Sequence, residues 1–219
     1  MVKKTGILAM AIIVLVVILA TLFFLAIPHL KQKTIAENEA KAQKTLKMLA
    51  EVSAAWRKRD GDRNRMQDYW TLDVAGFYYA KDKDGKEWKF IDIETAQADP
   101  SAANWANSEL SKPYTPIPKN GYYFIAMEKD GYGNENNIIK TSADLDGKGY
   151  PGKKLCCNKT RYGFCAYPAE YGKTGKETFI INQSNDVYWY DKGGQPILQW
   201  PPLENPPEVF KYDGGMATD

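Results

Sequence analysis

The chain has 219 residues, of which 26% are charged and 13% aromatic, and its formal net charge is +2. This composition argues against a wholly disordered chain, and without a basic excess we expect no nucleic-acid partner. The single histidine, His29, argues against His-based triads and His-rich metal sites. No catalytic constellation stands out among the other residues, so we do not expect an enzyme.

An uncharged apolar run, residues 7–27, follows a short basic leader, residues 1–6. Its 21 residues reach about 31 Å as a helix, which is enough to cross the hydrocarbon core of a bilayer. Secretion-signal cores are usually about 7–15 residues long, and no small-x-small cleavage pattern follows this run. The two lysines of the leader favour a cytoplasmic N-terminus, although the far side of the run is basic too. We predict a membrane anchor with the rest of the chain outside the cytoplasm.

The helix is predicted to continue through residues 28–59, which are rich in Ala, Lys, Glu and Leu. Pro28 should kink this rod rather than end it. Apolar residues recur at three-, four- or seven-residue steps and predict one buried stripe: Ile35, Ala42, Leu46, Leu49, Val52 and Trp56. A signal anchor followed by a membrane-proximal stalk would give the same periodicity.

The N-terminal segment combines a basic leader ending at Gly6, an apolar stretch, the sequence AIP ending at Pro28, and an Ala-rich amphipathic helix. In these features it resembles a type IV pilin or pseudopilin. In that family the prepilin peptidase cuts after the glycine, and a proline stands 21 positions after the first mature residue. Pro28 is 21 positions after Ile7 in this chain. The resemblance therefore implies processing between Gly6 and Ile7.

One residue departs from the pilin pattern. Pilins usually carry Glu at the fifth mature position, which is Ala11 here. That Glu pairs with the new amine of a neighbouring subunit, and a cation within an apolar helix bundle is costly when it is unpaired. Three explanations remain open: a minor or tip subunit, a filament without this pair, or an uncleaved anchor.

Beyond the helix, residues 60–219 are predicted to form a β-rich head with a Pro-rich C-terminal tail. Three segments, DGDRNRMQDYW, GYYFIAM and YPAEYGKTGKETFIINQSNDVYWYD, resemble parts of uncharacterised bacterial envelope proteins with a pilin-like N-terminus. The amphipathic stripe needs a sheet to cover it, so we expect an α+β, pilin-like fold in which an antiparallel sheet packs on the long helix.

Strands are predicted at five segments of the head: GYYFIAME, NNIIKTS, YGFCAYPA, ETFIINQ and DVYWYD. The last two should form a hairpin. Residues 74–93 are predicted to form another hairpin, with its turn near Asp84 and Gly85. A short helix is expected around residues 93–100, and the tail is expected to be an extended coil.

The segment DGDRNRMQD carries a candidate calcium site. Asp60, Asp62, Asn64 and Asp68 supply oxygen ligands at alternate positions of a tight loop, as a hard cation requires. The Gly and the bidentate Glu of such loops are replaced, and two arginines stand nearby. The alternative is a solvated turn, which Asp, Gly and Asn also favour. A second segment with Asp144 and Asp146 gives a weaker pattern of the same kind.

The three cysteines are Cys156, Cys157 and Cys165. Oxidation is expected outside the cytoplasm, and a bridge from Cys156 or Cys157 to Cys165 would leave one thiol free. Reduced thiols, a strained bridge between Cys156 and Cys157 and a metal site are the alternatives. Asn158 and Asn182 match the glycosylation sequon, but Asn182 also suits a turn.

The expected function is that of a structural subunit of a pilus-like or pseudopilus-like filament in the bacterial envelope. Before assembly the inner membrane would hold the subunit, with its head outside the cytoplasm. Its partners would be like or unlike filament subunits and the prepilin peptidase. The alternative is an uncleaved, membrane-tethered module that binds a glycan, a peptide or calcium and does not polymerise.

Overall fold

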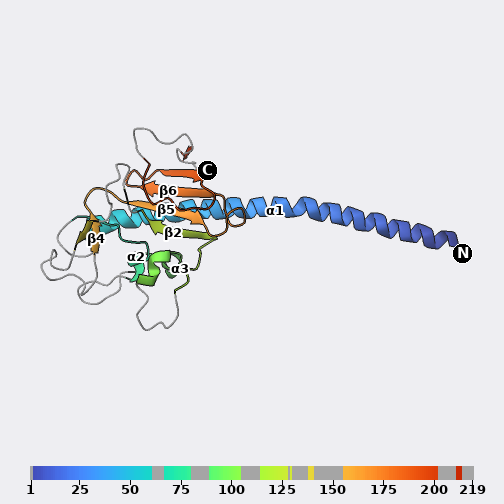
Figure 1. The fold of residues 1–219 in the computed structure, drawn as a ribbon, viewed down its shortest axis with the longest axis horizontal. Helices are drawn as coiled ribbons and strands as arrows, with labels where there is room; N and C mark the ends of the chain where they lie inside the picture. The colour runs from blue at the N-terminus through green and yellow to red at the C-terminus, as the bar shows by residue number, and fades with distance from the viewer. Residues whose placement is uncertain are drawn as a thin grey trace.

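A computed structural model describes residues 2–60, 67–79, 89–104, 114–127, 129, 138–140, 155–201 and 211–213. One long helix, α1, extends far out of a head, and the chain begins at its free end (Figure 1). Within the described residues, the head combines a five-stranded antiparallel sheet, a three-stranded antiparallel sheet and short helices. The predicted α+β class is confirmed.

Helix α1 (Val2–Arg59) has 58 residues and runs through Pro28 without interruption. Three basic residues fill its last turn and stabilise the negative end of the helix dipole: Arg57, Lys58 and Arg59. Asp60 then adopts a φ of 49°, and its N–H donates to the Arg57 carbonyl at 3.3 Å. A left-handed residue of this kind is a common helix terminator.

The predicted apolar stripe is the face that α1 buries in the head. Leu46 and Leu49 are wholly buried, and Ala42 and Trp56 are 1% exposed. Ile35 is also buried, and Val52 packs on the same core from its edge. The Trp56 ring contacts those of Trp70, Phe77 and Phe90 at centroid distances of 5.6, 6.1 and 5.8 Å. The 3.6-residue period therefore identified the face correctly.

The large sheet packs across this helix (Figure 1). Its strand order is β2-β5-β6-β7-β8: β2 (Tyr122–Ala126), β5 (Gly163–Pro168), β6 (Glu177–Asn182), β7 (Val187–Asp191) and β8 (Lys211–Asp213). Successive side chains alternate between its faces. Phe164 and Phe179 belong to the core beneath α1, whereas Cys165 and Ile180 belong to a second core with Trp200.

The hairpin between β6 and β7 forms as predicted. Asn182 ends β6, and its Oδ1 accepts the N–H and the hydroxyl of Ser184 at 2.9 and 2.7 Å. Asn185 completes the turn with a φ of 64°, which asparagine tolerates better than most residues. Two short polar residues thus reverse the chain and set the register of the hairpin.

The small sheet has the order β1-β4-β3: β1 (Tyr69–Trp70), β4 (Leu155–Asn158) and β3 (Ile138–Lys140). It lies at the end of the head opposite to the free part of α1 (Figure 1). Strand β3 was predicted, but β1, β4 and β8 were not. Strand β8 lies in the tail that the sequence predicts as coil.

The predicted hairpin over residues 74–93 is wrong in both arms, because residues 89–92 of its second arm form no strand and Ile93 begins a helix. Residues Gly76–Tyr79 form a helical turn, α2, because Asp73 and Asp99 accept the N–H groups at its start. The predicted turn near Asp84 and Gly85 lies outside the described residues. The short helix is confirmed as α3 (Ile93–Gln97), and a 3-10 helix, η1 (Pro100–Asn104), follows it.

Candidate assembly and membrane surface

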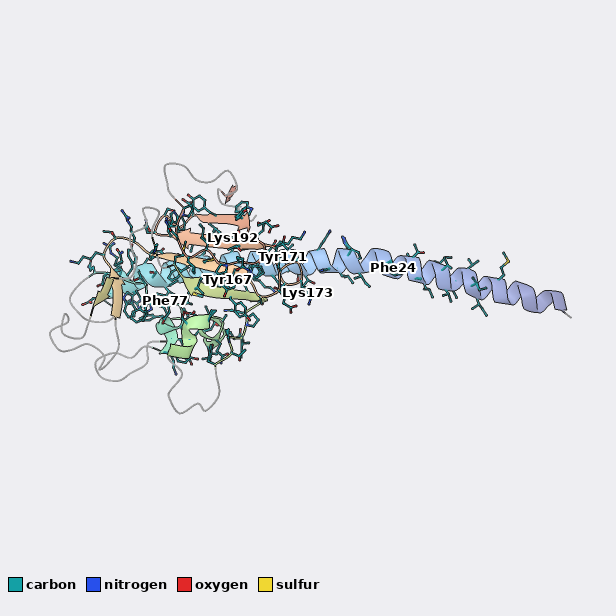
Figure 2. All side chains as sticks on the ribbon, in the orientation of Figure 1. Phe24, Phe77, Tyr167, Tyr171, Lys173 and Lys192 are labelled. Carbon is teal, nitrogen blue, oxygen red and sulfur yellow. The ribbon has the colours of Figure 1, made fainter. Side chains whose placement is uncertain are left out.

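In the described part of the chain, the N-terminal half of α1 is an apolar rod that nothing covers. Thirteen of its described large apolar side chains between residues 10 and 30 are exposed, among them Leu15 at 56%, Phe24 at 75% and Leu30 at 62%. Phe24 projects from the rod well outside the head (Figure 2). Among the described residues, α1 is one helix that is long and apolar enough to cross a membrane. It has the length and composition of a membrane anchor or of a signal sequence.

The predicted processing residues lie on the backbone of this helix. Gly6, Ile7 and Ala11 are all within α1, and their side chains lie outside the described part of the chain. Further along, Thr21 is satisfied locally because its hydroxyl donates to the Val17 carbonyl at 2.8 Å. The apolar rod therefore does not expose this hydroxyl as an unpaired donor.

Two polar residues of α1, Asn38 and Glu39, form hydrogen bonds with the base of the head, and we call these contacts the clasp. The Asn38 amide Nδ2 donates to the Thr174 carbonyl at 2.9 Å. The Glu39 carboxylate accepts the N–H groups of Lys176 and Glu177 at 2.9 and 3.2 Å. Two adjacent helix residues thereby satisfy three backbone groups between residues 174 and 177. These hydrogen bonds fix the position along α1 at which the sheet begins.

Gly175 allows this loop to approach the sheet closely. A Cβ at Gly175 would lie 2.0 Å from the Tyr122 hydroxyl, which donates to the Glu177 carbonyl at 3.0 Å. Burial, and then the charges of Glu39 and Glu177, raise the pKa of Tyr122. The phenol therefore stays a hydrogen-bond donor throughout the physiological pH range.

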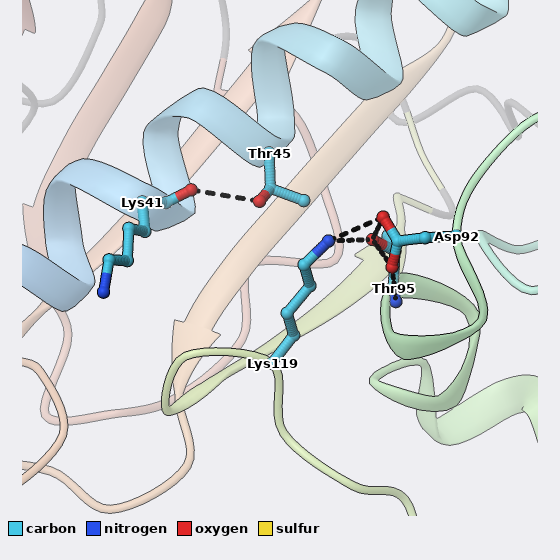
Figure 3. Close-up of polar contacts among 5 residues, drawn as sticks. All are labelled: Lys41, Thr45, Asp92, Thr95 and Lys119. Atoms are coloured by element: carbon cyan, nitrogen blue, oxygen red, sulfur yellow. Dashed lines mark hydrogen bonds and ion pairs between the residues drawn. The ribbon is translucent and has the colours of Figure 1, made fainter.

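A second polar cluster joins α3 to the start of β2 (Figure 3). The Lys119 ammonium contacts the Asp92 carboxylate and the Thr95 hydroxyl, both at 2.7 Å. Asp92 is also the N-cap of α3 and accepts the Thr95 N–H at 2.8 Å. Burial raises the pKa of Asp92, but the hydrogen bonds from Lys119 and Thr95 outweigh it, so the pKa lies below its usual value. This cluster therefore caps the N-terminus of α3 and links α3 to the start of β2.

Two buried carboxylates organise α2, and the sequence analysis missed both. Asp99 is wholly buried and accepts the N–H groups of Val74 and Ala75 at 2.7 and 2.9 Å. Asp73 is 1% exposed and accepts the Gly76 N–H at 2.6 Å. Burial raises the pKa of Asp99, and its backbone donors oppose that rise. Both carboxylates are engaged in caps, so neither offers a free reactive group.

The predicted calcium loop is only partly described. Asp60 terminates α1 and Asp68 is 2% exposed, whereas Asp62 and Asn64 lie outside the described residues, as do Asp144 and Asp146. Arg57 holds the two ends of the loop together, since its Nε donates to the Gln67 carbonyl at 3.3 Å. In the part of the chain that the structure covers, no three His, Cys, Asp or Glu residues are grouped to hold a metal ion. Calcium binding stays a prediction.

Cys165 is a free, wholly buried thiol, so the structure does not contain the predicted bridge to this residue. Its sulfur accepts the Ile197 N–H at 3.3 Å, and burial raises its pKa to about 12. Cys156 and Cys157 lie on β4, which belongs to the other sheet. Their side chains lie outside the described part of the chain, so a bridge between those two stays a prediction.

The two sequon asparagines both act as turn formers. The Oδ1 atom of Asn158 accepts the N–H groups of Thr160 and Arg161 at 2.9 and 3.0 Å. Asn182 makes the equivalent contacts with Ser184 and is only 6% exposed. In both sites the Ser or Thr of the sequon serves the turn.

Comparison with known proteins gives one match. A family model described as "Protein of unknown function (DUF2950)" matches residues 26–197. The match covers the second half of α1 and most of the head, and it begins near the end of the apolar rod. No curated protein and no solved structure matches this chain.

Proposed function

The chain belongs to the DUF2950 family of proteins of unknown function, and we propose that it is a structural subunit of a pilus-like or pseudopilus-like filament. The observation that carries this proposal is the division of α1. One half is covered by the head, whereas the other is apolar around its circumference and is not covered by any of the residues that the structure describes. A helix that is apolar on all sides is normally surrounded by lipid or by other helices.

The membrane is the first environment that we propose for the apolar rod. Burying each large apolar side chain is favourable by about 1.5–3 kcal/mol, so thirteen of them oppose release into water. In assembly, lipid around the rod would be exchanged for the rods of other subunits. That exchange gains no hydrophobic energy and relies on van der Waals packing. The head would then lie on the outer surface of the filament, outside the cytoplasm.

The processing step follows from the resemblance at the N-terminus. Cleavage after Gly6 would place a charged amine on Ile7, and Ala11 provides no carboxylate for it. An unpaired amine inside a bundle is costly, so we propose a minor or tip position, where one side of the rod has fewer neighbours. No residue is assigned a catalytic role in this account.

A second candidate function has one observation in its favour. The family match begins at residue 26, so it does not include Gly6 or most of the apolar rod. A membrane-tethered binding module for a glycan, a peptide or calcium would fit that boundary equally well. Such a module would keep its leader and would not polymerise.

Intact mass of the protein extracted from the envelope separates the two proposals. A filament subunit should lose Met1–Gly6 and begin at Ile7 when the prepilin peptidase is active, and should keep the leader in cells that lack it. An intact leader in both strains would contradict the filament proposal and favour the tethered module.

A further inference from the structure

The base of the head contacts one side of α1 at Asn38 and Glu39. Two loops, residues 117–121 and 169–176, meet there, and the Ala169 N–H donates to the Gly121 carbonyl at 2.9 Å. Tyr171 and Lys173 lie where α1 leaves the head (Figure 2). We call these two loops, together with residues 29–41 of α1, the collar.

The height of the collar above the apolar rod is set by helix geometry. Asn38 and Glu39 bind the second loop, whereas the last large exposed apolar residue of the rod is Leu30. Eight residues of helix separate Leu30 from Asn38, a rise of about 12 Å. The headgroup layer on each side of the hydrocarbon core is about 5–8 Å thick. The two loops of the collar therefore lie just above the headgroups, and their long side chains can reach down to the headgroups.

The collar carries a net positive charge. It contains six lysines and three glutamates, which give +3, whereas the whole chain has a net charge of +2. The leader contributes +2 through its two lysines, so the remaining residues sum to −3. The collar therefore has a net positive charge at the end of the head that faces the membrane, and this charge is electrostatically complementary to anionic phospholipid.

The exposed side chains of the collar suit a membrane interface. Tyr171 is 49% exposed and anchors its hydroxyl on the Asp191 carboxylate at 2.9 Å. Amphipathic aromatic rings gather at the headgroup level of membrane proteins. The Lys173 side chain is 69% exposed, although it pairs with Glu170. Lys31 and Lys176 are also exposed and stand on the two elements that meet at the base of the head.

We propose that the collar binds the anionic phospholipid headgroups of the membrane that holds α1, and that this contact seats the head on the bilayer before assembly. The proposal rests on the membrane anchoring described under "Proposed function". Because the anchor keeps the collar at the membrane surface permanently, weak individual contacts with the headgroups are sufficient to hold the head against the bilayer. Each lysine near an anionic surface contributes about fivefold to such an equilibrium.

The test is amine labelling of the full chain reconstituted in nanodiscs, with each lysine read by mass spectrometry. Labelling of Lys31, Lys173 and Lys176 should slow severalfold when phosphatidylglycerol is added to phosphatidylcholine. Lys58 and Lys159, exposed at the far end of the head, are internal controls and should not change. High salt should remove the difference, because the Debye length falls from about 10 Å at 0.1 M to about 3 Å at 1 M.

A pair of variants isolates the charge. Lys31→Gln with Lys176→Gln should abolish the protection of Lys173, whereas Lys58→Gln with Lys159→Gln should leave it unchanged. Equal labelling in both lipids would overturn the collar proposal while leaving the anchor intact. A chain that fails to insert into either nanodisc would instead refute the anchor itself.

Discussion

The two halves of α1 share one continuous backbone and differ in where their partners come from. Between Ile35 and Trp56 the apolar side chains form a stripe that the sheet covers, whereas between Met10 and Leu30 they surround the helix and stay exposed. The C-terminal half contributes to the stability of the head. The N-terminal half is available for contact with lipid or with other subunits. Folding and assembly should therefore respond to different residues of the same helix.

The same substitution in the two halves should separate these roles most strongly. Leu46→Ala removes a wholly buried side chain and should lower the free energy of unfolding of the head by about 2–5 kcal/mol. Leu15→Ala, at a site that is 56% exposed, should change it by less than about 0.5 kcal/mol. Urea unfolding in detergent, followed by tryptophan fluorescence, measures both. Equal losses would mean that the rod packs on the head.

The close packing at the base of the head should show the next largest effect. Gly175→Ala introduces a Cβ only 2.0 Å from the Tyr122 hydroxyl, and the resulting displacement should cost about 1–3 kcal/mol. Gly172→Ala, in the same loop, meets no atom within 4 Å and carries only the cost of a φ of 69°, about 1 kcal/mol or less. If thermal melts rank Gly172→Ala as the worse variant, the loop is not packed as described.

The clasp from α1 to the sheet should be measurable at single amides. Glu39→Ala removes the acceptor of the Lys176 and Glu177 N–H groups and should cost about 1 kcal/mol. Hydrogen exchange at those two amides should become faster. Glu37→Ala is the matched control, because its pair with Lys33 spans 4.0 Å on an exposed surface and contributes about 0–0.5 kcal/mol. An unchanged exchange rate in Glu39→Ala would contradict the clasp.

The smallest effect should come from the ion pair between Lys119 and Asp92, and it should depend on pH. The pKa of Asp92 in the folded protein lies below its usual value of 3.8, so the pair stabilises the fold above that value. The contribution is lost as the pH falls through the lowered pKa. Lys119→Gln should therefore cost less than about 1 kcal/mol at neutral pH and nothing in strong acid. A cost that persists in acid would mean that Lys119 acts through packing alone.

Local patterns predicted most of the architecture. The stripe from Ile35 to Trp56 was readable because helical periodicity agrees with burial: five of its six residues are buried and Val52 is partly buried. The strands ending at Pro168 and Asn182 were readable because they are short runs rich in apolar and aromatic residues that end in turn-forming residues. In these elements the cause of the structure lies within a few positions of the residue concerned.

The failures have causes that are distant in the sequence. Gly76–Tyr79 has the aromatic content of a strand, yet it forms a helical turn because Asp99, more than 20 positions away, accepts the N–H groups at its start. Cys165 lies within ten residues of both other cysteines, yet β4 and β5 belong to different sheets. Sequence distance did not reveal which sheet each strand would join. The collar was likewise hidden, because its loops are brought together only by the fold.

Photo-crosslinking from the rod tests the central claim most directly, namely that the exposed half of α1 finds its partners in other subunits. A benzophenone amino acid at Val16, which is 58% exposed, should give a ladder of covalent multimers in cells with an active prepilin peptidase. The same amino acid at Leu46, inside the head, should crosslink only within its own chain. A Val16 probe that yields monomers linked to lipid, even after the leader has been removed, would contradict the account.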